Sequence, residues 1–196
     1  MQIEAKKISL SRQLCLCALM CGVAVVVIVL FHSQPYIPSL IGGLPVFYQI
    51  PLGVALGGLF WAASAMGYKY TVSRQSTQYT VESYSRLDLR GWNPLWIALA
   101  AGFGEELLFR GALQPLLGIW VTSALFVLVH ARAYRFSKFN KRMLVQALCI
   151  FATSVFFGFL ARYAGLVAAM IVHAAIDVVG LYTIRRVTHA QVPAAA

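Results

Sequence analysis

The segment AGFGEELLFRGALQPLLG, residues 101–118, decides the fold because it places two glutamates and an arginine inside a run of apolar residues. An ionisable group within a membrane-spanning helix costs about 2.5–3.5 kcal/mol on insertion scales. Such groups therefore usually face the interior of a helix bundle or an aqueous cavity, and they usually serve a function. Glu105, Glu106 and Arg110 thus predict a polar site inside a bundle of membrane-spanning helices.

The composition of the whole chain agrees with this prediction. Of the 196 residues, 60% are hydrophobic and only 11% are charged, a balance that several apolar runs of spanning length explain. We expect an all-α membrane protein of about six transmembrane helices packed around an intramembrane polar cavity. The predicted spans cover residues 14–31, 44–66, 94–117, 119–137, 143–161 and 165–184.

These spans form a single integral membrane domain over residues 1–196, with two peripheral spans in 14–66 and a four-span core in 90–186. The one sizeable loop, 67–93, is polar with interleaved tyrosines, and we expect a solvated connector or a short amphipathic segment on the inner leaflet. It ends at Asn93 and Pro94, which predict the N-cap and first residue of the third span. The first span reads as an anchor; a signal peptide is the alternative, but no A-x-A-like cleavage site follows.

The net charge of +10 orients the chain in its membrane and needs no nucleic-acid partner. Fourteen of the sixteen lysines and arginines fall on one side of a six-span arrangement, leaving Arg162 opposite and Arg110 within a span. By the positive-inside rule both termini are cytoplasmic. The expected location is the inner (cell) membrane of a bacterium, the lipid bilayer is the expected partner, and no oligomeric state is predicted.

Three separate spans carry ionisable residues at similar depth. With a rise of about 1.5 Å per residue, Glu105 lies roughly 16 Å from the cytoplasmic end of its helix, His130 roughly 12 Å, His173 roughly 18 Å and Asp177 roughly 12 Å. Convergence of these side chains on one site is the simplest arrangement that satisfies them all.

Helical spacing separates the two glutamates. Glu106 and Arg110 are i,i+4 neighbours and suit a buried salt bridge, whereas Glu105 lies about 100° away around the helix axis. His173 and Asp177 are also i,i+4 neighbours. Gly102 and Gly104 permit close approach of a neighbouring helix, a water molecule or a substrate backbone.

The motifs at these positions resemble those of a known family. EELLFR (Glu105 to Arg110), FVLVH (Phe126 to His130) and HAAID (His173 to Asp177) are similar to the EExxxR, FxxxH and HxxxN/D motifs of the CAAX protease and bacteriocin-processing family, also called the Abi family. All three stand in order, each in a separate hydrophobic span. The resemblance covers about residues 90–186.

The resemblance implies an intramembrane glutamic endopeptidase that uses no metal and no cofactor. Glu105 and His130 would hold and deprotonate a water molecule, His173 and Asp177 would stabilise the oxyanion, and Glu106 with Arg110 would fix the geometry of the motif. Its substrate would be a membrane-associated peptide or protein, such as a bacteriocin or signalling precursor, a membrane-anchored sorting tail or a prenylated peptide.

Asp177 departs from the prenyl-protein-processing members, which have Asn at this place. An ionised aspartate cannot donate a hydrogen bond to an oxyanion. Asp177 must therefore stay protonated or act by orienting His173 and stabilising its charged form.

Other interpretations of the same residues exist. Glu105 could balance Arg110 in a structural network, the histidines could be interfacial or helix-linking residues, and two histidines with a glutamate could hold zinc, although HExxH is absent. The alternative functions are a proton- or cation-coupled transporter, for which no inverted repeat is visible, and a non-catalytic immunity or partner protein.

Overall fold

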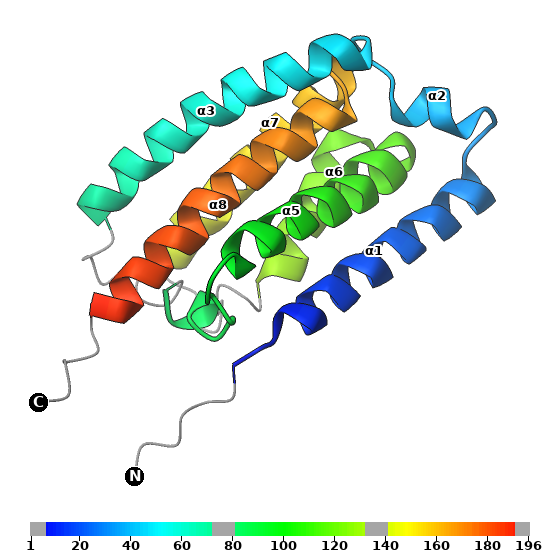
Figure 1. Ribbon diagram of the computed structural model, residues 1–196. Helices are drawn as coiled ribbons and strands as arrows, with labels where there is room; N and C mark the ends of the chain where they lie inside the picture. Colours follow the sequence, from blue (N-terminus) through cyan, green and yellow to red (C-terminus); the bar gives the residue numbers. More distant parts are fainter. Residues whose placement is uncertain (1–6, 72–80, 132–140, 191–196) are drawn as a thin grey trace, which may run out of the picture.

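The computed structural model describes residues 7–71, 81–131 and 141–190, and in them the chain forms a bundle of helices (Figure 1). The elements are α1 (Leu10–Phe31), α2 (Tyr36–Leu40), α3 (Val46–Thr71), α5 (Asn93–Glu106), η1 (Leu107–Leu113), α6 (Gln114–His130), α7 (Lys141–Tyr163) and α8 (Leu166–Ala190). The prediction of an all-α membrane protein is confirmed.

The described helices provide five stretches long and apolar enough to cross a membrane: 10–31, 46–67, 93–130, 143–163 and 166–188. The stretch 93–130 reverses direction at Gly118, whose φ of 77° interrupts the helical path. Glycine adopts this conformation without steric cost. Consequently α5, η1 and residues 114–117 of α6 run in one direction and the rest of α6 returns, so this stretch supplies two of the six predicted spans. The predicted spans 94–117 and 119–137 meet at this glycine.

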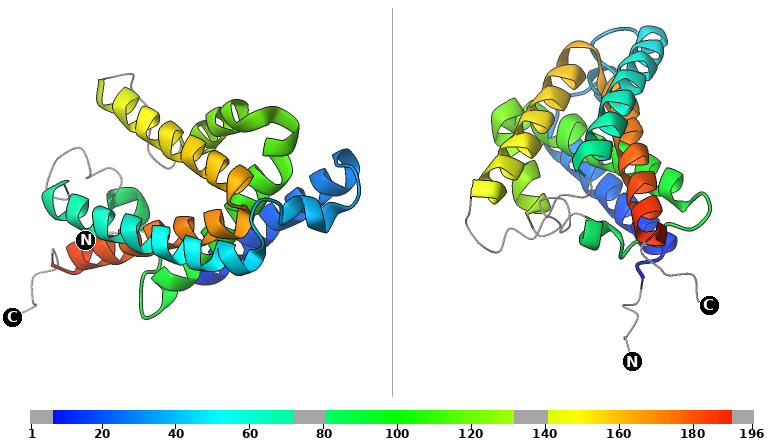
Figure 2. Two further views of the ribbon diagram at one scale, coloured as in Figure 1. Left: turned by 90° about the horizontal axis from the view of Figure 1, so that it is seen from above. Right: turned by 90° about the vertical axis from the view of Figure 1, so that its left-hand side faces the viewer.

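Helix α8 lies at the centre of the bundle. It packs between α3 and α5, α1 packs on the other side of α5 and η1, and α6 and α7 lie behind this layer (Figures 1 and 2). Gly53 and Gly102 bring α3 and α5 against α8: a Cβ at either position would lie 3.0 Å from an atom of α8. The close approach of α5 to α8 lets side chains of these two helices reach the same space.

Helix α1 supports α5 behind the two glutamates. The Cys17 thiol donates to the Ala100 carbonyl at 3.1 Å, and a Cβ at Gly104 would lie 2.9 Å from the Cys17 Sγ. Gly102 and Gly104 thus admit neighbouring helices, α8 and α1 respectively, and this is one of the three possibilities that the sequence left open.

The element after Glu106 is a π-helix, η1, rather than the regular α-helix expected through residue 117. Pro115 follows it and cannot donate the i→i−4 hydrogen bond of an α-helix. Wider turns of this kind recur at functional sites. The Nε2 of His32 lies 2.8 Å from the Ala112 carbonyl oxygen and ties the end of α1 to η1.

Hydrogen bonds also fix the two ends of the bundle. At one end the fully buried Gln49 side chain donates to the Leu44 carbonyl at 2.6 Å and accepts from the Val167 amide at 3.1 Å, which joins the beginnings of α3 and α8. At the other end, the Ile8 amide donates to the Arg86 carbonyl at 2.7 Å, and the Asp88 amide donates to the Ile8 carbonyl at 2.9 Å. The segment before α1 is therefore joined to the segment before α5.

The predicted N-cap of the third span is wrong by one residue. Asn93 is the first residue of α5, and the N-cap position is occupied by Trp92, which makes no capping hydrogen bond through its side chain. Several predictions lie outside the described residues, namely those on the C-terminal end of the fourth span, on part of the loop 67–93 and on the basic residues Lys6, Arg74, Arg132, Arg135 and Lys138.

Candidate active site

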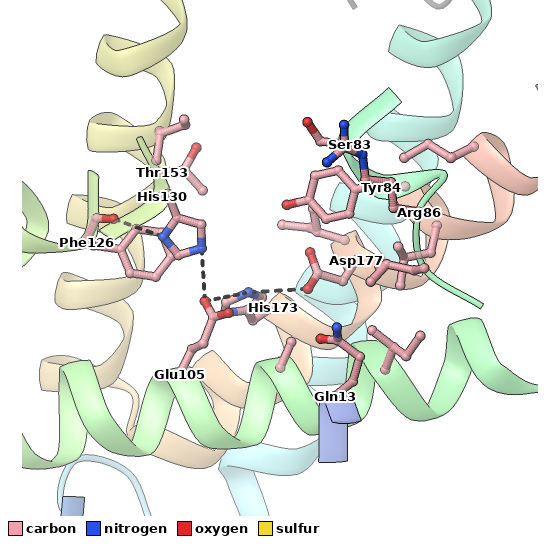
Figure 3. Close-up of a pocket in the computed structure, with 18 of the residues that line it drawn as sticks. Gln13, Ser83, Tyr84, Arg86, Glu105, Phe126, His130, Thr153, His173 and Asp177 are labelled. Atoms are coloured by element: carbon pink, nitrogen blue, oxygen red, sulfur yellow. Dashed lines mark hydrogen bonds and ion pairs between the residues drawn. The ribbon is translucent and has the colours of Figure 1, made fainter. Parts of the chain in front are cut away.

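The structure brings all six predicted site residues together. Glu105 and Glu106 end α5, Arg110 lies in η1, His130 ends α6, and His173 and Asp177 lie one turn apart on α8. The Oε2 of Glu105 is 3.5 Å from the Nε2 of His130 and 3.9 Å from the Nε2 of His173 (Figure 3). The close packing of α5 on α8 and the reversal at Gly118 produce this convergence.

His130 is held in one orientation by its own helix. Its Nδ1 lies 2.9 Å from the Phe126 carbonyl oxygen, and because a carbonyl can only accept, the Nδ1 carries a proton. The imidazole also stacks on the Phe126 ring with centroids 4.2 Å apart. In the neutral ring the Nε2 is then an acceptor, and this atom faces Glu105. Phe126 therefore sets both the tautomer and the plane of the histidine four residues later.

His173 is held from another helix. Its Nδ1 lies 2.7 Å from the Oε1 of Glu106, while its Nε2 faces Glu105 and lies 3.6 Å from the Oδ2 of Asp177. The ring stacks on Phe157 of α7 at a centroid distance of 5.1 Å. Glu106 thus makes the short bond to His173, and Asp177 lies on the opposite side of the ring, toward the pocket.

Glu106 and Arg110 form a pair with no contact to solvent. The Arg110 Nε is 3.3 Å from the Glu106 Oε2, and both side chains are at most 1% exposed. Arg110 also donates to the Ser154 hydroxyl at 3.0 Å and to the Ser154 carbonyl at 3.2 Å. Its guanidinium lies 4.8 Å from the centre of the Phe126 ring, and this cation–π contact joins the pair to the helix that carries His130.

Glu105 has a different environment from its neighbour. Its side chain is 17% exposed, and no described residue donates a hydrogen bond to its Oε2. A buried carboxylate oxygen is usually hydrogen-bonded, so an unpartnered one calls for a functional explanation. The Oε2 of Glu106 also lacks a hydrogen bond, but it lies 3.3 Å from the Arg110 Nε, and only Glu105 of the two lines the cavity. Glu105 is therefore the glutamate that can accept a proton from a bound molecule.

A cavity of about 610 Å³ opens beside these groups. Glu105, His130, His173 and Asp177 line it at one end, and apolar side chains including Ile97, Ile150, Phe157 and Leu181 form its walls. Its size and mostly apolar lining are those of a small-molecule or peptide site. Among the described residues, no group of three His, Cys, Asp or Glu side chains is placed to hold a metal ion.

Sequence reasoning missed two residues that contact the cluster: Ser154, which accepts a hydrogen bond from Arg110, and Phe157, which stacks on His173. Ser154 and Phe157 lie on α7, which carries no motif and no ionisable residue at that depth. No sequence signal could have placed them. Pro115, within the quoted segment, is a signal that could have indicated an irregular helix.

Comparison with protein families supports the interpretation of the motifs. Residues 89–179 match the family model described as type II CAAX prenyl endopeptidase Rce1-like. The matched segment contains all six site residues, and the match confirms the resemblance to the CAAX protease family. No curated protein and no solved structure matches the chain. The family match points to a protease, and the apolar helices make the chain a multi-pass membrane protein.

Proposed function

We propose that the chain is an intramembrane endopeptidase that hydrolyses a peptide bond of a membrane-associated protein or peptide. The observation that carries this proposal is the position of the Glu105 Oε2, which no described residue hydrogen-bonds and which faces the Nε2 of His130 at the end of the cavity. The family match supports the class of reaction.

Glu105 and His130 would activate a water molecule together. Their facing atoms are 3.5 Å apart, and a water molecule about 2.8 Å from each can donate one proton to the carboxylate and one to the imidazole. The water oxygen then attacks the scissile carbonyl carbon as its proton passes to Glu105. The tetrahedral intermediate then collapses: its carbon–nitrogen bond breaks as the Glu105 carboxyl group returns that proton to the leaving amine. General base catalysis of this kind contributes about 10²–10⁴-fold.

His173 would stabilise the oxyanion. Its Nδ1–H donates to Glu106, and a second proton on Nε2 makes the ring a cation among the carboxylates of Glu105, Glu106 and Asp177. The Nε2–H points to the cavity, where an oxyanion can accept it. Asp177, 3.6 Å from that nitrogen, stabilises the cationic ring, and in this role it need not donate a hydrogen bond itself.

Glu106 and Arg110 would act without touching the substrate. Their buried pair fixes the Nδ1 of His173 and holds the end of α5, so that Glu105 stays aimed at the cavity. A site of this kind must be held to within a fraction of an ångström to work. This role agrees with the supporting one expected from the i,i+4 spacing.

We further propose that both termini are cytoplasmic and that the membrane is the inner membrane of a bacterium. The first residues of α1 and the last residues of α8 lie at the same end of the bundle (Figure 1). In a background without the four native cysteines, an impermeant thiol reagent applied to intact cells should label a cysteine at Ser33 and not one at Ser11. Labelling of the cysteine at Ser11 would show that the N-terminal end of α1 is external and would contradict the proposed orientation.

The function is tested with the full chain purified in detergent and a library of apolar peptides with and without a lipid anchor. Cleavage in water enriched in ¹⁸O should place one heavy oxygen in the new carboxyl group. The Glu105→Ala variant should show no cleavage. The Glu82→Gln variant, which changes an exposed glutamate outside the cavity, should cleave as the native protein does. Cleavage that survives in Glu105→Ala contradicts the mechanism. Ion flux into liposomes without cleavage supports a transporter. The absence of both cleavage and ion flux supports a partner protein.

A further inference from the structure

The mouth of the cavity, at the end away from Glu105, is formed by residues that precede the segment matched by the family model. Ile8, Gln13, Ser83, Tyr84, Arg86 and Leu87 line it, whereas the matched region begins at residue 89. The parallel bridge between Ile8 and Leu87 fixes the backbone on both sides of this end. Leu87 is buried against Ile97 and Ile184, so the neighbouring Arg86 has a defined position at the rim.

Charge is distributed unevenly along the cavity. The carboxylates of Glu105 and Asp177 lie at the inner end, and most of the side chains between the two ends are apolar. Among the described lining residues, Arg86 is the one lysine or arginine. In the view of Figure 3 the labelled side chains run from Glu105 past His173 and Asp177 to Arg86, which lies beside Ser83 and Tyr84.

Arg86 differs from Arg90, four residues later in the same segment. Arg90 is bound on both sides of its guanidinium by Asp88, with two contacts of 2.8 Å. No ion pair among the described residues involves Arg86, whose side chain is exposed at the mouth of the cavity. A guanidinium presents a planar fork that matches a carboxylate, and Arg86 can offer it to an incoming molecule.

We propose that Arg86 determines specificity by binding a carboxylate of the peptide substrate, about three to five residues from the scissile bond. This inference rests on the proposed peptidase function. Lining positions on α5 extend from Glu105 to Ile97 and those on α8 from His173 to Ile184, which correspond to about 12 Å and 16 Å of helix. An extended peptide spans this length with about that number of residues. The apolar walls then accept the side chains in between.

The carboxylate can come from the C-terminus of the peptide or from a glutamate side chain. Three matched peptides separate these sources: an apolar fluorescein-labelled peptide with a free C-terminus, its carboxamide, and a longer amidated peptide with one glutamate at the corresponding position. Binding is measured by fluorescence anisotropy on the Glu105→Gln variant, which should bind without cleaving. Dodecyl maltoside, a neutral detergent without phosphate, removes competition from lipid headgroups.

Loss of one charge-assisted hydrogen-bonding pair predicts a difference of about 10- to 100-fold between a carboxylate peptide and the carboxamide. Arg86→Gln, added to Glu105→Gln, should abolish that difference, Arg86→Lys should keep part of it, and Arg90→Gln should leave it unchanged. With Glu105 intact, Arg86→Gln should raise KM for the carboxylate peptide and leave kcat nearly the same.

Equal affinity for acid and amide, a difference that persists in Arg86→Gln, or no binding of any of the three peptides would overturn the inference. Preferential binding that depends on Arg86, in a protein without peptidase activity, would overturn the proposed function and leave the carboxylate site standing. Peptidase activity that depends on Glu105 but is the same for the carboxylate and carboxamide peptides would support the proposed function and overturn the carboxylate site.

Discussion

The candidate site has two layers of ionisable side chains inside the helix bundle, and the two layers differ in how these side chains are paired and exposed. The support layer, formed by Glu106, Arg110 and Ser154, is closed: its side chains are buried and bind one another. The cavity layer, formed by Glu105, His130 and Asp177, is partly exposed, with 17%, 19% and 35% of the respective side chains accessible. Glu105 and Glu106 are adjacent in sequence, so the direction of each side chain alone separates a structural role from a chemical one.

His173 connects the two layers. One ring nitrogen binds Glu106 in the support layer and the other faces Glu105 and Asp177 in the cavity layer. If the difference between the layers is real, changes in the cavity layer should reduce activity, changes in the support layer should reduce stability, and changes at His173 should reduce both.

The largest expected effect on activity with little effect on stability comes from His130. Replacing it with alanine removes the acceptor that faces Glu105, and we expect kcat to fall about 10²–10⁴-fold. Because the ring lies at the cavity and is 19% exposed, and because its 3.5 Å contact with Glu105 is longer than the 2.7 Å bond of His173 to Glu106, the melting temperature should change little.

His173→Ala is the matched comparison for His130→Ala. It should reduce kcat to a similar extent and also lower the melting temperature, because Glu106 loses its 2.7 Å partner. Equal melting temperatures for the two variants would remove the distinction between the layers.

The support layer is tested by a double-mutant cycle. Glu106→Gln or Arg110→Met each leaves a buried charge without its partner and should destabilise the protein by about 3–5 kcal/mol. The double variant should recover part of this loss, giving a coupling of about 0.5–3 kcal/mol. Chemical unfolding in mixed micelles measures the four proteins, and strictly additive losses would show that the pair does not act as a unit.

A smaller effect is expected where α5 meets α8 behind the site. A Cβ at Gly102 would lie 3.0 Å from the backbone N of Ala174 and the carbonyl of Met170, so Gly102→Ala should destabilise by about 1–3 kcal/mol. Gly58→Ala on α3 is the control, because nothing lies within 4 Å of its Cβ position. That change should be neutral or stabilise by up to about 1 kcal/mol. Equal thermal stability of the two variants would contradict the close contact.

Much of this arrangement could be predicted from the sequence. The apolar runs located the spans, and the break between 117 and 119 falls at Gly118, where the chain turns. The pair of Glu106 with Arg110 followed from helical spacing alone, since both residues lie on one segment. Local periodicity is sufficient for such features because they depend on neighbours within one or two turns.

Contacts between helices far apart in sequence could not be predicted in the same way. His173 and Glu106 are 67 residues apart, and the spacing within each helix does not say which carboxylate the imidazole will meet. Ser154 is joined to Arg110 across 44 residues by a helix that carries no motif. The contact of η1 with α1, made by the Nε2 of His32 and the Ala112 carbonyl, is also not specified by the pattern of apolar residues.

The most direct test of the account compares two variants that differ in position by one residue, Glu105→Gln and Glu106→Gln, in the same detergent. Glu105→Gln should lose about 10²–10⁴-fold in kcat while its melting temperature changes by less than about 2 °C. Glu106→Gln should lower the melting temperature by about 10 °C, since it leaves Arg110 buried without a carboxylate. Full turnover in Glu105→Gln, or equal losses of stability in both variants, would contradict the assignment of Glu105 to catalysis and Glu106 to support.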